Sequence, residues 1–222
     1  MNKNNHINFF QEKFYGNLNL ALVSIKDQSW KECIARLYQE EVERTGRAFI
    51  HDEYVETMIR MVETWITGEF TSCLMTGGIG VGKTALLKAV MRLFDALRVP
   101  ITIPPLRCRS LVFYDATELC LKYVMNEDVR YEVHNCKVLF IDDAGYEADG
   151  YSSYGNLMRP IHDIILSRYS SRLPTVVATN LDLSGFSKRY GKRISDRVNE
   201  LYAIIQCPPH ESYRRLPSLA SK

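Results

Sequence analysis

Residues Gly77–Thr84 read GGIGVGKT and match the pattern G-x-x-x-x-G-K-[ST], which decides the fold of the whole chain. The short apolar stretch Thr71–Thr76 precedes them, and Ala85–Leu97 follows with the apolar periodicity of a helix. A strand, a glycine loop and a helix start form a phosphate site, because the loop N–H groups and the helix N-terminus both attract an anion. A plain glycine turn is the alternative, but a turn has no use for the Lys-Thr pair. The stretch therefore predicts a nucleoside triphosphate site.

Each residue type in this loop has a chemical task. The glycines permit positive φ angles and leave room for phosphate to approach the backbone. Lys83 is expected to bridge the β- and γ-phosphates, and the Thr84 hydroxyl is expected to ligate Mg²⁺. The residues expected to contact the nucleotide here are Gly77, Gly78, Ile79, Gly80, Val81, Gly82, Lys83, Thr84 and Ala85.

The composition is that of an ordinary soluble protein. The chain has 222 residues, 46% hydrophobic and 24% charged, with a formal net charge of +2, so overall basicity does not indicate nucleic acid. The six cysteines show no C-x-x-C spacing, and no apolar run approaches the ~18 residues of a membrane span. We therefore expect a soluble, cytoplasmic protein with reduced thiols and no membrane partner.

The order of expected elements indicates an α/β fold. Two amphipathic helices are predicted first, one from a capping box at Ser29–Glu32 to Gly46 and one over Asp52–Thr67. The expected strands are Thr71–Thr76, Leu111–Tyr114, Val138–Ile141, Thr175–Ala178 and Ala203–Cys207. The expected helices between them are 83–97, 116–126, 156–170 and 191–200. Strands separated by helices predict a parallel sheet covered on both faces.

Two acidic residues end the apolar strand VLFIDD at 138–143. Carboxylates at the C-terminal end of a strand in a parallel sheet face the ligand crevice. We therefore expect Asp142 to hold the Mg²⁺ shell and Asp143 to polarise an attacking water. A buried strand stopped by an Asp-Asp turn is the other interpretation.

Asn180 and two arginines extend the expected site. Asn180 ends the strand TVVATN and is placed to contact the γ-phosphate or orient the water, although a turn-forming Asn is equally compatible. Arg193 and Arg197 lie four residues apart, on one helical face, where an arginine offered to a neighbouring subunit would stabilise transition-state charge. A solvated charged helix is the alternative interpretation for the arginines.

Positive charge is concentrated near the C-terminal end of the chain. Five basic residues lie between Lys188 and Arg197, and Arg107 and Arg109 lie in the proline-bearing segment before the second expected strand. These residues are candidates for contact with DNA phosphates. Solvated surface charge is the alternative.

The chain resembles AAA+ ATPases, specifically the DnaC/IstB-like family of replicative helicase loaders and transposase helper proteins. The resemblance spans roughly Ala48–Arg215 and rests on GGIGVGKT (77–84), VLFIDDAG (138–145), SRLPTVVATNLDL (171–183), YGKRISDRV (190–198) and ESYR (211–214). It implies a five-stranded parallel sheet in the order 5-1-4-3-2, ATP and Mg²⁺ as ligands, a homo-oligomer in the active state, and a lid domain that is absent or vestigial.

The resemblance also implies a role for each matching residue. Lys83 and Thr84 correspond to Walker A, Asp142 and Asp143 to Walker B, and Asn180 to sensor 1. Arg197 corresponds to the arginine finger, with Arg193 in reserve, and Arg214 is a weaker candidate for a sensor-2 contact. Walker B usually ends in Asp-Glu, and the shorter Asp143 predicts slow ATP hydrolysis.

The expected organisation is a helical partner-binding segment at 1–46, an ATPase core at 47–216 and a tail at 217–222. The preferred function is that of a helicase loader that places a replicative helicase on single-stranded DNA. A helper of an insertion-sequence transposase is the nearest alternative. A small P-loop nucleoside or nucleotide kinase, or a nucleotide-dependent scaffold without turnover, are the alternatives from other classes.

Overall fold

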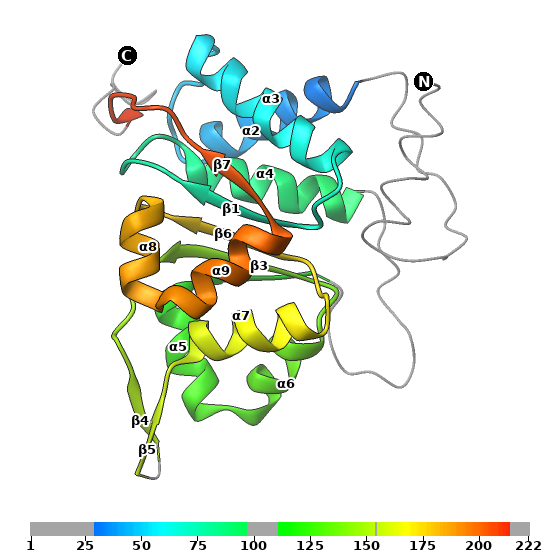
Figure 1. The fold of residues 1–222 in the computed structure, drawn as a ribbon. Helices are drawn as coiled ribbons and strands as arrows, with labels where there is room; N and C mark the ends of the chain where they lie inside the picture. The colour runs from blue at the N-terminus through cyan, green and yellow to red at the C-terminus, as the bar shows by residue number, and fades with distance from the viewer. Residues whose placement is uncertain (1–28, 97–110, 154, 214–222) are drawn as a thin grey trace.

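A five-stranded parallel sheet lies at the centre of the structure and carries helices on both faces (Figure 1). The structure is a computed structural model that describes residues 29–96, 111–153 and 155–213. The strands of the central sheet are β1 (Ser72–Thr76), β2 (Leu111–Asp115), β3 (Val138–Ala144), β6 (Thr175–Thr179) and β7 (Tyr202–Gln206). The helices are α2 (Trp30–Glu43), α3 (Glu53–Thr67), α4 (Lys83–Ala96), α5 (Ala116–Met125), α6 (Glu127–Asn135), α7 (Pro160–Ser170), α8 (Leu183–Tyr190) and α9 (Lys192–Leu201).

The strand order is β2-β3-β6-β1-β7, and every pairing in this sheet is parallel. The labels differ from the expected 5-1-4-3-2 because a separate antiparallel hairpin, β4 (Tyr151–Ser153) with β5 (Asn156–Met158), takes two numbers. Counted without that hairpin and read from β7, the central strands follow 5-1-4-3-2. The predicted α/β fold is confirmed.

Two hydrophobic clusters lie on opposite faces of the sheet. One cluster joins α2, α3 and α4 to the sheet, with Leu37, Met58 and Phe94 among its buried residues. The other contains Leu119 of α5 and Ile165 of α7, together with buried residues of α6, α8 and α9. Strands β1, β3 and β6 are buried along almost their whole length, and such strands read as continuous apolar runs in the sequence.

Side-chain caps fix where several helices begin. Ser29 and Glu32 form the predicted capping box at the start of α2. Asp52 accepts from the Val55 N–H at 2.8 Å and caps α3. Asn126 ends α5 and caps α6, so that one residue separates the two helices.

The structure corrects three expected elements. The helix expected at 156–170 begins only at Pro160, because residues 156–158 form strand β5 and proline favours the first helical position. The helix expected at 116–126 is followed by α6, which was not predicted. Helix α8 was not predicted either, and it is followed by Gly191, whose φ of 87° suits glycine.

A fully buried arginine links the starts of strands β3 and β6. Arg168 of α7 is 0% exposed and donates to the carbonyls of Val133, Cys136 and Pro174 at 2.8, 3.0 and 2.7 Å. Its Nε also donates to the Thr175 hydroxyl at 2.9 Å. These acceptors lie just before β3 and at the start of β6, so Arg168 holds the two strand starts together.

The five described cysteines, Cys33, Cys73, Cys120, Cys136 and Cys207, are free and buried. None of the helices in the described part of the chain is long and apolar enough to cross a bilayer. Arg107, Arg109, Arg214, most of the segment 1–46 and the tail lie outside the described residues.

Candidate nucleotide site

The loop between β1 and α4 adopts the backbone that its glycines permit. Gly77, Gly80 and Gly82 have φ angles of 148°, 78° and 96°. A Cβ atom on Gly82 would lie 2.0 Å from the Tyr38 hydroxyl oxygen, so this position excludes a side chain on both conformational and steric grounds.

Lys83 lies at the centre of the site and is only 5% exposed. Its ammonium group donates to the carbonyls of Gly77 and Gly78 at 2.9 and 2.6 Å, and to Asn180 Oδ1 at 2.5 Å. Asn180 Nδ2 in turn donates to Asp143 Oδ1 at 3.1 Å. The structure therefore joins Lys83, Asn180 and Asp143 into one hydrogen-bonded chain, although they come from three separate segments.

An irregularity in the pairing of β3 with β6 determines the direction of the Asp143 side chain. The pairing of β3 with β6 shifts between Ile141 and Ala144, so Asp142 and Asp143 together lie opposite one residue of β6. Asp143 has a φ of 51°, a left-handed conformation that aspartate tolerates better than most residues. Such a bulge redirects side chains, which explains how two consecutive carboxylates both reach the same end of the sheet.

Asp142 and Thr84 fit the expected Mg²⁺ ion. Asp142 is 6% exposed, and its Oδ1 has no hydrogen-bond partner in the described part of the chain. Burial raises the pKa of Asp142, while a hydrogen bond from the Thr84 side chain acts in the opposite direction. A buried, unpartnered carboxylate oxygen beside a hydroxyl matches the hard oxygen ligands that Mg²⁺ prefers.

The chain alone does not surround a metal ion. Among the described residues there is no group of three or more His, Cys, Asp or Glu side chains that would hold one. Magnesium at Thr84 and Asp142 would therefore take its remaining ligands from the nucleotide and from water, as is usual for Mg²⁺ in phosphate sites.

The expected arginine finger contacts helix α7. The Arg197 guanidinium packs over the Tyr169 ring at 5.0 Å and donates to the Arg193 carbonyl at 3.4 Å. The Tyr169 hydroxyl donates to Glu200 at 2.7 Å, which fixes the ring. Arg197 is thus held on the face of α9 that is turned toward α7.

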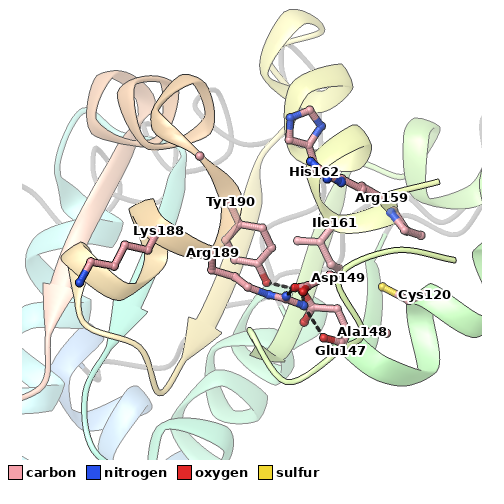
Figure 2. Close-up of a pocket in the computed structure, with 12 residues that line it drawn as sticks. Cys120, Glu147, Ala148, Asp149, Arg159, Ile161, His162, Lys188, Arg189 and Tyr190 are labelled. Atoms are coloured by element: carbon pink, nitrogen blue, oxygen red, sulfur yellow. Dashed lines mark hydrogen bonds and ion pairs between the residues drawn. The ribbon is translucent and has the colours of Figure 1, made fainter. Parts of the chain in front are cut away.

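One of the cations expected to bind DNA, Arg189, is paired with acidic side chains of the same chain. Arg189 lines a cavity of about 350 Å³. In Figure 2 its side chain extends toward Glu147 and Asp149, with which it forms ion pairs. The Arg189 side chain is only 17% exposed, so it is not a free surface cation. Lys188 points away from these acids in Figure 2, and Lys188, Lys192 and Arg193 are exposed.

Sequence reasoning missed the side chains behind the glycine loop. The Tyr54 hydroxyl donates to the Val81 carbonyl at 3.1 Å, and the Tyr38 hydroxyl donates to the Gly82 carbonyl at 3.4 Å. Tyr38 was part of an apolar helical stripe and therefore read as core. Periodicity identifies the buried face of a helix, but it does not reveal which group the hydroxyl of a buried tyrosine contacts.

No family model and no curated protein matches the sequence. Solved structures do match: the DnaC helicase loader at 21% identity, over 77% of this chain and 98% of that one, with a TM-score of 0.54. DnaI matches at 24% identity over 79% and 93%, with a TM-score of 0.52. DnaA from Aquifex aeolicus, bound to AMPPCP, matches at 14% identity over 75% and 50%, with a TM-score of 0.53.

The TM-scores of 0.53, 0.54 and 0.52 show that the fold is shared. The chain shares the fold of P-loop AAA+ proteins and spans half the length of DnaA. The resemblance to a DnaC-like AAA+ fold, read from the sequence, is confirmed at this level.

Proposed function

We propose that this chain is a slow, Mg²⁺-dependent ATPase of the DnaC type that places a replicative helicase on single-stranded DNA in the cytoplasm. The observation that supports it best is the chain Lys83–Asn180–Asp143 at the end of the sheet where β1, β3 and β6 terminate. A cation, an amide and a carboxylate in contact beside a glycine loop are the groups that ATP hydrolysis requires.

Each of these residues has one task in the proposed reaction. Lys83 exchanges the carbonyls of Gly77 and Gly78 for phosphate oxygens, which its charge neutralises. Asn180 orients the attacking water through its amide, and Asp143 accepts a proton from that water. Thr84 and Asp142 would hold Mg²⁺, which when bound offsets the negative charge of the β- and γ-phosphates.

Slow turnover follows from the length and bonding of Asp143. Its side chain is one methylene shorter than the glutamate usual at this position, and one oxygen is already occupied by Asn180 at 3.1 Å. The carboxylate is therefore restrained in the free protein, which suits a timed switch better than a motor.

The partners are inferred from likeness and charge. The match covers 98% of the DnaC helicase loader, and a DnaA neighbour carries both AMPPCP and single-stranded DNA. The exposed cations Lys188, Lys192 and Arg193 are available for a DNA strand. The segment 1–46 is proposed to bind the helicase, the core 47–216 to bind ATP, and Arg197 to complete the site of the next subunit in a homo-oligomer.

The first test is the dependence of ATP binding on Lys83. Lys83→Ala should weaken ATP binding strongly, because it removes the glycine-loop charge expected on the β- and γ-phosphates. Calorimetric titration of both proteins measures it, with the exposed Lys122→Ala as a matched control. Equal affinity in all three proteins would contradict the phosphate site.

The second test identifies the partner. Capture on the tagged protein in an extract of the native host, scored separately for a replicative helicase and a transposase, separates the loader from the transposase helper. Recovery of the transposase alone would overturn the loader assignment while leaving the ATPase proposal intact.

A further inference from the structure

The carbonyl groups of three consecutive residues of the glycine loop each accept a hydrogen bond from another segment of the chain. The Tyr213 N–H donates to the Gly80 carbonyl at 3.1 Å. The Tyr54 hydroxyl donates to the Val81 carbonyl at 3.1 Å, and the Tyr38 hydroxyl donates to the Gly82 carbonyl at 3.4 Å. The Gly82 carbonyl also accepts the Leu86 N–H at 3.0 Å, so Tyr38 contributes the weaker share there.

The planarity of the peptide makes these contacts relevant to phosphate. In a trans peptide the C=O and the following N–H point in opposite directions within one plane. A donor that fixes the carbonyls of Gly80, Val81 and Gly82 therefore also fixes the N–H groups of Val81, Gly82 and Lys83. N–H groups in such a loop are the ones that cradle an anion.

The donors come from three segments that are far apart in the sequence and are tied together. Tyr38 belongs to α2, Tyr54 to α3, and Tyr213 follows β7. The Tyr213 hydroxyl donates to Asp52 Oδ2 at 2.8 Å, at the start of α3, and His210 packs against the Tyr54 ring at 4.4 Å. The loop thus has one continuous support.

Both tyrosine side chains are buried. Tyr38 is 1% exposed and Tyr54 is 8% exposed. Burial raises the pKa of both hydroxyls, so they stay protonated and keep donating across the physiological pH range. The hydroxyl of Tyr38 also occupies the space that a Cβ on residue 82 would need, so a tyrosine in this position requires glycine at residue 82.

We infer that Tyr54 and Tyr38 are positioning residues that orient the N–H groups of Gly82 and Lys83 toward the nucleotide phosphates. Through them, helices α2 and α3 support the nucleotide site from behind the loop backbone. This inference rests on the proposed binding of ATP.

The test compares Tyr54→Phe and Tyr38→Phe with the unmodified full chain. Each variant keeps the ring and loses only the hydroxyl. Titration with ADP and with AMPPCP should show about two- to tenfold weaker binding for Tyr54→Phe and a smaller loss for Tyr38→Phe, the scale of one neutral hydrogen bond. The loss should be alike for both nucleotides, because backbone N–H groups of the loop face the α- and β-phosphates that both contain.

Tyr202→Phe is the matched control. Tyr202 is 3% exposed and pairs with Ser72, at the start of β1, while the glycine loop follows the other end of that strand. Its substitution should lower the thermal midpoint of the nucleotide-free protein without changing either affinity. In ATP hydrolysis, Tyr54→Phe should raise KM and leave kcat unchanged, because Asp143 and Asn180 are untouched.

Each outcome decides a separate point. If the unmodified protein binds neither nucleotide, the proposed function fails and the inference fails with it. If it binds both and the two tyrosine variants match it, or follow Tyr202→Phe in losing stability alone, the positioning inference is overturned. If Tyr54→Phe does not fold, the result for Tyr38→Phe decides in the same way.

Discussion

Replacing Asp143 by asparagine is the sharpest test of the proposed chemistry. The carboxylate accepts a hydrogen bond from Asn180 at 3.1 Å, and the introduced amide oxygen can accept the same bond. The residue has a φ of 51°, which asparagine adopts as readily as aspartate, whereas alanine would add about 1–2 kcal/mol of backbone strain. Asp143→Asn therefore removes the charge and the proton acceptor while leaving the local structure in place.

The expected loss in rate follows from the role assigned to the carboxylate. A positioned general base contributes roughly 10²–10⁴-fold to a reaction. Its loss should raise the barrier by about 3–5 kcal/mol, at about 1.4 kcal/mol for each factor of ten. ATP affinity should stay close to that of the unmodified protein, because Asp143 reaches the phosphates only through Asn180 and water.

The assay is phosphate release at saturating ATP, together with calorimetric titration of AMPPCP. Asp128→Asn serves as a control, since Asp128 is an exposed carboxylate on α6 and should keep its full rate. Turnover of Asp143→Asn at the unmodified rate would refute the reasoning, because hydrolysis would then proceed without the carboxylate proposed to accept the proton.

Three further predictions test assembly, DNA and pH. Mixing Lys83→Ala with Arg197→Ala protein should recover ATPase activity that neither variant shows alone. The Lys83→Ala subunit still supplies Arg197, and the Arg197→Ala subunit still binds ATP. No recovery would place Arg197 outside the neighbouring site. Replacing Lys188 and Lys192 by alanine should reduce the slope of log affinity against log salt for single-stranded DNA by about 1.4, at ~0.7 for each phosphate contact. An unchanged slope would leave both as plain surface charge. Burial, helped by Arg168, lowers the pKa of His134, so the unfolded chain binds that proton more tightly and the free energy of unfolding should fall as pH drops below about 6.5. Denaturant unfolding at several pH values should show this fall, and His134→Gln should weaken it.

The sequence allowed the central sheet and the polar residues at one end of it to be predicted. Strands buried on both faces appear as apolar runs, and polar residues at their ends mark the ligand edge. Asp143 and Asn180 are predicted from such strand ends and Lys83 from the glycine-loop pattern, and the structure joins the three through hydrogen bonds.

Most of the missed elements have little apolar signal. Helix α6 buries only Val133 among its nine residues, and β4 and β5 have three residues each. The late start of α7 did have a signal, since Pro160 occupies its first position.

The missed contacts depend on tertiary structure. Arg189 and Glu147 are 42 residues apart, so no local pattern shows that the arginine is paired. The same holds for Tyr54 and the loop, which are 27 residues apart. Residue type and spacing predict what a side chain can do, while only the fold shows what it already does.

The buried Arg168 has a consequence for the order in which the chain folds. Its acceptors lie near residue 133 and near residue 174, on segments that are adjacent only once β3 has paired with β6. A guanidinium buried without these carbonyls would be strongly unfavourable, so α7 cannot dock stably onto half of the sheet. Helix α7 and the two central strands should therefore form and open as a single cooperative unit, with amide hydrogens that exchange at a common free energy.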